Sequence, residues 1–354
     1  MPNPAAVFRP ADTPPDPPLS IGPYRLPNRV FSAPMAGVTD LPWRRLARRL
    51  GAGHCVSEMV ASRAELRASR KTSLRMSHDG EPGPIAAQLV GVDPDEMAAA
   101  AHANVDAGAQ IIDINMGCPA KKVCNRWAGS ALMQDEALAV RIVDAVVRAM
   151  QPRGVPVTLK MRTGWCNEQR NAPSLAHAAQ EAGVALVVVH GRSREQGYGG
   201  QAEYDTIAEI KRRLRIPVVA NGDIDSAAKA REVLRATGAD AVMIGRAALG
   251  RPWLPGHIAR ALSDGVEPPL PGVAEQGRWL LEHLRAHHDH YGAAGIGSAR
   301  KHVGWAVARL PGGATFRAHF NTLAEPQAQL DAVAGFFDTL PADDPAPTPW
   351  AHAA

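Results

Sequence analysis

The feature that most constrains the fold of this chain is a regular alternation of short apolar segments with amphipathic helical patterns. Continuous aliphatic runs bounded by turn residues are typical of parallel strands that are buried on both faces. Eight such segments are predicted to form strands: 30–33, 54–59, 85–89, 111–115, 157–161, 186–190, 218–220 and 241–244. We therefore expect an α/β protein with a parallel sheet.

The segments between the strands carry recognisable helix ends. Asp93 is suited to cap a helix that has Pro94 at its first position, and Gly108 is suited to end it. The ranges 135–150 and 225–237 likewise begin at an aspartate and show helical periodicity. Helices are thus predicted between the strands.

Two architectures can combine these elements. Eight strands alternating with helices over roughly 230 residues match the size of a TIM (β/α)8 barrel. A doubly wound sheet is the alternative, but no GxGxxG motif follows the first strand, and polar residues follow nearly all the strands rather than one pair. A TIM barrel over residues 21–264 is therefore preferred.

The flanking segments have a different character. After a Pro/Gly linker at 265–272, only helical patterns follow, at 275–290, 297–307 and 326–340. They predict a small all-α domain at 273–340. The proline-rich ends, 1–20 and 341–354, cannot bury enough apolar surface to order themselves, so they are expected to be disordered.

Composition excludes several classes of protein. The chain has 354 residues, of which 45% are hydrophobic and 21% charged, and no apolar run approaches the ~18 residues of a membrane span. Its start lacks the pattern of a secretion signal.

The cysteines and the net charge narrow the compartment and the partners. Four scattered cysteines without CxxC spacing argue against a zinc site or a disulfide framework. The lack of a disulfide framework favours the reducing cytoplasm. A net charge of +4 permits an anionic partner without requiring one.

Polar residues stand where the predicted strands end, and in a barrel these ends meet at one mouth. Each has a structural explanation by itself; His190, for example, could be a hydrogen-bonded core histidine. Together they indicate a polar ligand, because burying so many polar groups without partners is costly. The candidates are Pro34, Met35, Ala36, Gln88, Asn115, Cys118, Lys160, Arg162, His190, Asn221, Gly222, Asp223, Gly245 and Arg246.

The last two strand ends suggest a phosphate site. Asn221, Gly222 and Asp223 follow the seventh strand, and Gly245 with Arg246 follows the eighth. Barrels commonly bind phosphate at this position through backbone N–H groups, and arginine adds a forked cation. A phosphorylated cofactor is therefore predicted.

Lys160 and Cys118 are the candidates for chemistry. Lys160 could stabilise a developing anion, as a reduced flavin requires, or it could form the Schiff base of an aldolase. Cys118 could be a nucleophile, an acid or an inert thiol. An unperturbed thiol has a pKa of about 8.5, so it is mostly protonated at neutral pH and can donate a proton. Cys124 follows no strand and is interpreted as incidental.

Two histidines have the spacing of metal ligands. His283 and His287 lie four residues apart on one predicted helix. No acidic residue or cysteine stands near them at ligand spacing, so no metal site is predicted.

Several long motifs resemble those of the tRNA-dihydrouridine synthases, especially their bacterial B subgroup. They include APMAGVTD at 33–40, DINMGCPAKKV at 113–123, VTLKMRTGW at 157–165, ANGDI at 220–224, MIGRAA at 243–248 and ARKHVGW at 299–305. The similarity extends from about residue 21 to about residue 340. It leaves only the proline-rich ends without a counterpart.

The resemblance implies an FMN-binding barrel with a helical tRNA-binding domain, which reduces a uridine of the tRNA D-loop with NADPH. It implies that Cys118 gives the uracil a proton, that Asn115 grips the base and that Arg162 lies beside it. The implied flavin contacts are Pro34, Met35, Ala36, Gln88, Lys160 and His190, with Asn221, Gly222, Asp223, Gly245 and Arg246 on its phosphate. Contacts to tRNA are expected from Lys121, Lys122, Arg300 and Lys301.

Two other functions remain open. A flavin barrel could act on a free pyrimidine, as in dihydroorotate dehydrogenases, although such a small substrate needs no helical domain. Alternatively, an RNA-binding protein could have kept the barrel without its chemistry, although the complete set of candidate residues argues against this. No membrane and no obligate protein partner is expected.

Overall fold

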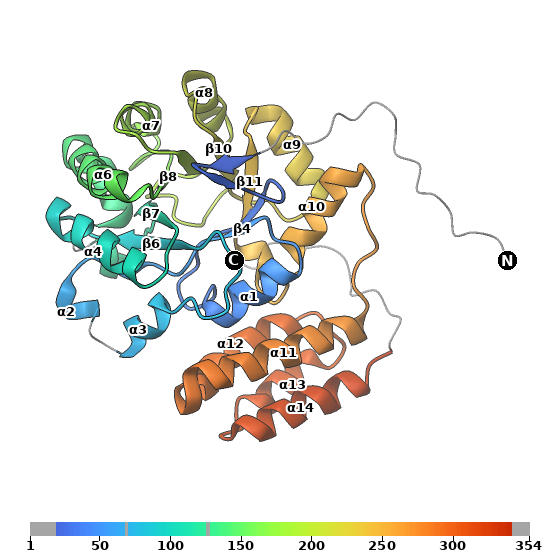
Figure 1. Ribbon diagram of the computed structural model, residues 1–354. Coiled ribbons are helices and arrows are strands. Elements are labelled where there is room, and N and C mark those ends of the chain that lie inside the picture. The colour runs from blue at the N-terminus through green and yellow to red at the C-terminus, as the bar shows by residue number, and fades with distance from the viewer. Residues whose placement is uncertain (1–18, 68–69, 125–127, 342–354) are drawn as a thin grey trace.

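The computed structural model describes residues 19–67, 70–124 and 128–341. Its main body is a parallel sheet of nine strands in the order β4-β3-β11-β10-β9-β8-β7-β6-β5, with helices around the outside (Figure 1). The strands are β3 Val30–Ser32, β4 His54–Cys55, β5 Val60–Ala61, β6 Ala86–Val90, β7 Ile111–Met116, β8 Val157–Arg162, β9 Leu186–His190, β10 Val218–Asn221 and β11 Ala241–Ile244. The predicted TIM barrel is confirmed.

β4 and β5, which stand first and last in this strand order, follow each other within the segment 54–61. β4 pairs with β3 and β5 pairs with β6, while Val56 between them bridges to Ala86. The prediction of one uninterrupted strand at 54–59 is therefore wrong. The segment changes partners here: the Ser57 N–H donates to the Ala86 carbonyl at 2.9 Å, and the Ser57 hydroxyl accepts the Gln88 N–H at 3.1 Å.

The apolar core has two layers because strand side chains alternate in direction. In β7, Ile111 packs inside the barrel, whereas Ile112 and Ile114 pack between the sheet and the helices. A hairpin of β1 (Ser20–Ile21) and β2 (Tyr24–Arg25) adds its apolar side chains to the inner layer. It packs on the first residues of several strands, so it closes the N-terminal end and leaves the opposite mouth to polar residues.

The barrel helices begin at the expected residues in most cases. Asp93 caps α4 by accepting the Glu96 N–H at 2.9 Å, and Asp135 caps α6 in the same way. α9 is an exception, because its cap is Ser226 rather than Asp225. The helices are α1 Leu41–Arg49, α2 Ala64–Arg67, α3 Arg70–Met76, α4 Pro94–Asp106, α5 Lys121–Cys124, α6 Glu136–Met150, α7 Ala172–Glu181, α8 Asp205–Arg213, α9 Ala227–Thr237 and α10 Leu254–Asp264.

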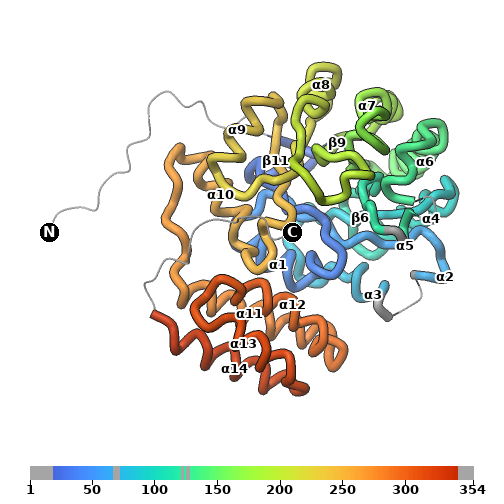
Figure 2. The backbone as a smooth tube through the Cα atoms, turned by 180° about the vertical axis from the view of Figure 1, so that it is seen from behind, coloured from blue at the N-terminus to red at the C-terminus, as the bar shows by residue number. Residues whose placement is uncertain are grey.

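The C-terminal helices form a layer of their own, orange to red in Figures 1 and 2, which packs against α1 of the barrel. They are α11 Val273–Tyr291, α12 Gly295–Val307, α13 Gly313–Phe320 and α14 Pro326–Asp338. Leu284, Val303, Phe320 and Val333 belong to their separate core. α13 was not predicted, because its eight residues show too little apolar periodicity.

The chain ends differ slightly from expectation. Residues 1–18 and 342–354, where a disordered arm and tail were predicted, lie outside the described residues. Leu19 is buried and Ser20 belongs to β1, so ordered structure begins before the predicted boundary at residue 21. Within the described chain, no helix has the length and hydropathy to cross a bilayer.

Candidate active site

A cavity of about 910 Å³ opens at the C-terminal ends of the barrel strands. This volume is near the upper end of the ~300–1,000 Å³ that small-molecule sites occupy. Fifteen of the residues singled out in the sequence line it: Pro34, Met35, Ala36, Gln88, Asn115, Cys118, Lys160, Arg162, His190, Asn221, Gly222, Asp223, Gly245, Arg246 and Lys301.

Of the other three predicted contacts, one does not line the cavity and two cannot be placed by their side chains. Arg300 is half-buried on α12 and does not line the cavity. Lys121 and Lys122 begin α5, immediately after the loop that carries Cys118. Their side chains lie outside the described part of the structure.

Asn115, at the end of β7, shapes the loop that carries Cys118. Its Oδ1 accepts the backbone N–H groups of Gly117 at 3.1 Å and of Cys118 at 2.9 Å. Its Nδ2 donates to Gln88 Oε1 at 2.7 Å and lies 4.0 Å from the thioether sulfur of Met59. Because thioether sulfur is a weak acceptor, one amide hydrogen of Asn115 has no strong partner among the described residues.

A buried carboxyl group fixes the orientation of Gln88. Gln88 Nε2 donates to Asp113 Oδ2 at 2.7 Å, and Thr158 Oγ1 donates to Asp113 Oδ1 at 2.6 Å. Burial raises the pKa of Asp113. The Gln88 oxygen faces Asn115 and its nitrogen faces Asp113, so the amide has one fixed orientation. Its second N–H and the second lone pair of its oxygen are left for a ligand in the cavity.

Residues 128–132 hold the Cys118 loop in place through hydrogen bonds and close packing. The Cys118 carbonyl accepts the Ser130 N–H at 3.1 Å and the Ser130 hydroxyl at 2.9 Å. A side chain at Gly129 would bring its Cβ within 2.8 Å of the same carbonyl oxygen. The Cys124 thiol is buried 3.5 Å from that oxygen, so it packs beneath the loop instead of facing the cavity.

The Cys118 thiol is kept in its protonated form. Burial raises its pKa, and this outweighs the opposite effects of a backbone N–H at Ala120 and of the nearby Arg162 and Lys160 cations. A protonated thiol can donate a proton but is a poor nucleophile. Among the three roles considered for Cys118, this argues against the nucleophile and is compatible with the acid or an inert thiol.

Lys160 is a half-buried cation in the cavity wall. Its Nζ donates to Asn221 Oδ1 at 3.2 Å, and Asn221 Nδ2 donates to the Met243 carbonyl at 2.8 Å. Burial, helped by Arg162, lowers the pKa of Lys160 to about 8. No carboxylate of the described residues forms an ion pair with it, so an anionic ligand would supply the missing countercharge.

A carboxylate joins two arginines beside the eighth strand end. The buried Arg192 holds Asp223 with two bonds of 2.9 and 2.6 Å, and Arg246 reaches the same carboxylate at 3.2 Å. Although burial raises the pKa of Asp223, the hydrogen bonds from Arg192 and Ala202 outweigh it and keep that pKa low. Asp223 thus orients Arg246, and its carboxylate is unsuited to touch a phosphate directly.

The turn that carries Asp223 requires glycine before it. Gly222 has φ +125°, and a Cβ there would lie 2.7 Å from the Ala202 Cβ and 3.1 Å from His190. Asp223 follows with φ +48°. The close backbone approach keeps His190 and the Asp223 carboxylate at the same end of the cavity.

Arg162 mainly supports the cavity wall. Its guanidinium donates to the carbonyls of Gly117, Ser193 and Gly197, each at 2.8 Å. It therefore connects the Cys118 loop to the loop after β9. It lines the cavity as predicted, but most of its donors are already used.

His190 is a neutral imidazole among cations. Burial, and then the charges of Arg162, Lys160, Arg192 and Arg246, hold its pKa well below the usual value. Its Nε2 lies 3.3 Å from Arg192 Nη1. It can accept or donate a hydrogen bond without adding charge.

Arg192 and Tyr198 also line the cavity. Arg192 stands two residues after His190, at a strand end that the sequence singled out, although no ligand contact was predicted for it. Tyr198 is 56% exposed at the cavity rim, with the Arg162 and Arg246 guanidinium carbons 5.5 and 5.0 Å from its ring centre. Its surroundings, Gln196-Gly-Tyr-Gly-Gly, form a glycine-rich loop that places one aromatic ring at the mouth.

Fold and site together define a barrel enzyme whose mouth holds a protonated thiol, a half-buried lysine and an arginine pair in one large cavity. The family model for dihydrouridine synthase matches residues 31–340. The chain therefore belongs to the dihydrouridine synthase family.

Curated relatives are similar over nearly their whole length. The chain is 55% identical to tRNA-dihydrouridine synthase B of Xanthomonas campestris, with 93% of this chain and 98% of that protein covered. It is 56% identical to the protein of the same name from Pseudomonas aeruginosa, with coverages of 90% and 96%. For the Escherichia coli protein the identity is 49%, with coverages of 91% and 100%.

Solved structures share the fold. A morphinone reductase mutant in complex with tetrahydroNAD has a TM-score of 0.52 at 18% identity, covering 68% of this chain and 89% of that one. A variant of NCR from Zymomonas mobilis has a TM-score of 0.52 at 19% identity, with coverages of 69% and 90%. At these identities the two similarities concern the fold alone.

Proposed function

We propose that this protein reduces a uridine in the D-loop of tRNA to 5,6-dihydrouridine, with FMN as its cofactor and NADPH as its reductant. Family membership and the names of the curated relatives support the reaction and the substrate. The observation that carries the proposal is the protonated Cys118 thiol in the same cavity as the uncompensated Lys160 cation.

The cavity fits a flavin nucleotide. Lys160 and Gln88 would face the polar edge of the ring system, because one is a cation that lacks a carboxylate and the other is a fixed amide. Pro34, Met35 and Ala36 would provide an apolar wall, and His190 would face the ring without charge. Backbone groups from Asn221 to Asp223 and at Gly245 would hold the phosphate, together with the Arg246 guanidinium.

When bound and reduced, the flavin supplies the hydride that C6 of the uracil accepts. Cys118 then donates its thiol proton to C5, so the base gains two hydrogens and the thiol becomes a thiolate. Lys160 and Arg162 favour that thiolate, since both cations lower the pKa of Cys118. Water afterwards returns a proton to the sulfur.

Asn115 has one amide hydrogen with which to hold the base. That hydrogen now faces Met59 at a long distance, so a uracil carbonyl would be a better acceptor. Arg162 would lie beside the base as part of the wall. Tyr198, exposed at the rim, offers a flat surface to a nucleotide that leaves its stack.

The tRNA would contact the rim and the helical domain at 273–340. Lys301 lines the cavity next to Gly37; its Nζ lies so close that a Cβ added at Gly37 would be 2.8 Å away. Arg300 on the same helix, and Lys121 and Lys122 after the Cys118 loop, would add contacts to phosphates. A tRNA substrate and four free cysteines point to the cytoplasm as the place of action.

A comparison of substrates tests the proposal. The purified protein with FMN and NADPH is given either tRNA that lacks dihydrouridine or free uracil, uridine and orotate. Dihydrouridine should appear in the D-loop of tRNA alone. Turnover of free pyrimidines at an equal or higher kcat/KM would favour a dihydroorotate dehydrogenase-like function, and failure to bind FMN would refute the proposed cofactor.

A further inference from the structure

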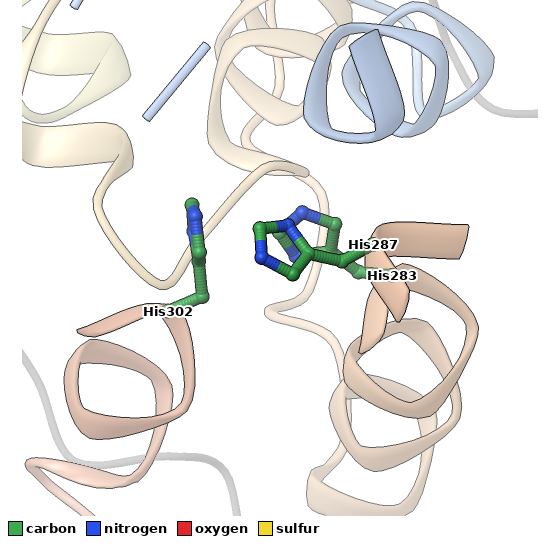
Figure 3. A group of neighbouring side chains, drawn as sticks. All are labelled: His283, His287 and His302. Carbon is green, nitrogen blue, oxygen red and sulfur yellow. The ribbon is translucent and has the colours of Figure 1, made fainter. Parts of the chain in front are cut away.

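Three histidines from two helices meet where the helical layer packs against the barrel. His283 and His287 belong to α11, and His302 belongs to α12 (Figure 3). One nitrogen of each lies within 4.8 Å of those of the other two, and all three side chains are buried. The sequence separates His302 from its partners, so residue spacing could not reveal this group.

Their rings are arranged as around a common centre. Ring centres are 4.8 Å apart for His283 and His302, 5.3 Å for His287 and His302, and 6.1 Å for His283 and His287. Three imidazoles on one tetrahedral ion, at metal–nitrogen distances of about 2.1 Å, have ring centres about 5 Å apart. Small rotations of the side chains would therefore close the group around an ion.

Two of the histidine nitrogens lack a partner. Nε2 of His283 and Nε2 of His302 are buried and have no hydrogen-bond partner among the described residues. Such groups are rare in proteins because each costs the loss of a bond to water. These two histidines, though not His287, line a small pocket of about 20 Å³, which is room for about one water molecule or ion.

The charge next to the group suits a cation. Asp40 Oδ2 lies 3.2 Å from His287 Nδ1 and places a negative charge beside the group. A carboxylate in this position fixes the ring of a ligating histidine and increases its basicity. His287 would then bind the ion through Nε2, which lies 2.7 Å from the Ser298 hydroxyl, so this hydroxyl would have to turn away.

We propose that His283, His287 and His302 form a site for a divalent transition metal such as Zn²⁺, with Asp40 as its supporting carboxylate. Imidazole ligands suit this class of ion. Asp40 also caps α1 by accepting the Trp43 N–H at 3.0 Å. The ion would thus fasten α11 and α12 to the barrel, directly beside Lys301 at the cavity rim.

The first test measures metal content and affinity. The full-length protein is stripped with a chelator and dialysed against micromolar free Zn²⁺, and bound zinc is counted by mass spectrometry of the element. We expect one zinc per chain and a rise in Tm of at least about 3 °C over the stripped protein. Stripped wild-type protein that binds no zinc would overturn the proposal.

Variants assign the site. His283→Gln and His302→Gln keep similar size and polarity but should lower zinc affinity about a hundredfold. His288→Gln is the matched control, because this buried histidine is next to His287 on α11 but outside the group. Equal zinc binding by His302→Gln and wild type, with circular dichroism showing both folded, would overturn the site.

If the variants do not fold, a Co²⁺ spectrum of the wild-type protein still tests the site. Co²⁺ added to stripped protein should give the difference spectrum of a tetrahedral site with nitrogen ligands. A thiolate-to-cobalt charge-transfer band would mean that a cysteine binds the ion, and a featureless spectrum would mean that no ordered site exists. Either result would contradict the proposal.

Discussion

Burial sets the protonation of the groups that line the active-site cavity. It raises the pKa of Cys118 and lowers that of His190, so both are uncharged at neutral pH. Lys160 remains a cation below its pKa of about 8. The cavity therefore combines a protonated thiol, a neutral imidazole and a lysine cation. The pKa shift of each group depends on the exclusion of water.

The titration of Lys160 predicts how FMN affinity depends on pH. An anionic ligand binds the protonated amine better, so binding raises the lysine pKa. Affinity should then be constant below pH 8 and fall as pH rises through about 8. Fluorescence titration of FMN at several pH values measures this.

Matched variants identify the titrating group. Lys160→Met should bind FMN more weakly at neutral pH and lose the pH dependence around 8. Lys211→Met, which removes a lysine paired with Asp240 away from the cavity, should keep the wild-type profile. A wild-type affinity that is flat from pH 7 to 9 would exclude this role for Lys160.

The Asn115 side chain predicts a loss of activity that exceeds its effect on stability. Asn115→Ala removes the acceptor of the Cys118 and Gly117 N–H groups, so the thiol should lose its position. We expect uridine reduction to slow at least tenfold, with a loss of about 1–3 kcal/mol in unfolding free energy. Steady-state kinetics and urea denaturation measure the two.

Asn104→Ala provides the comparison. Asn104 is equally buried, but it bonds to the Ala100 carbonyl within α4 and lies outside the cavity. It should lose stability without a comparable loss in kcat. Equal losses of kcat in both variants would mean that Asn115 acts on the fold alone.

Among the elements, α4 shows most clearly how local sequence sets structure. Asp93, Pro94 and Glu96 define its start in both the sequence and the structure. Asp93→Ala should lower the unfolding free energy by about 1 kcal/mol and leave uridine reduction unchanged. Asp95→Ala, also in the first turn but not the cap, should cost less; equal costs would argue against the cap bond.

Other elements depend on contacts that sequence does not reveal. Ser226 displaces Asp225 as the cap of α9, because the chain enters the helix one residue later than the pattern indicates. The segment 54–61 splits because it pairs with β3 on one side and β6 on the other. Such choices are made by tertiary pairing, whereas buried strands and strong caps follow from local sequence.

In the whole molecule, the barrel topology predicted which residues would meet. Strand ends far apart in the sequence line one cavity, because a closed parallel sheet directs them to one mouth. Tyr198 was missed, since its contacts come from the loop after β9 folding back over the mouth. The histidine group was missed because it forms between helices whose relative placement the sequence does not specify.

The helical layer and the rim should share the binding of tRNA. Replacing Arg300 and Lys301 by alanine should weaken tRNA binding and reduce the slope of log affinity against log salt by about 1 per lost phosphate contact. Binding measured at several salt concentrations tests this. Arg148→Ala with Arg213→Ala is the control, because both are exposed on barrel helices and paired with a carboxylate; an equal change there would indicate only a nonspecific charge effect.

The most direct test of the reduction mechanism follows a single turnover of enzyme whose flavin has been reduced by NADPH. With tRNA that lacks dihydrouridine, the wild-type flavin should be reoxidised as dihydrouridine forms in the D-loop. In Cys118→Ala the flavin spectrum should be unchanged, but reoxidation by tRNA should slow by about 10²-fold or more. Reoxidation of Cys118→Ala at the wild-type rate, with equal formation of dihydrouridine, would contradict the role of Cys118 as the acid.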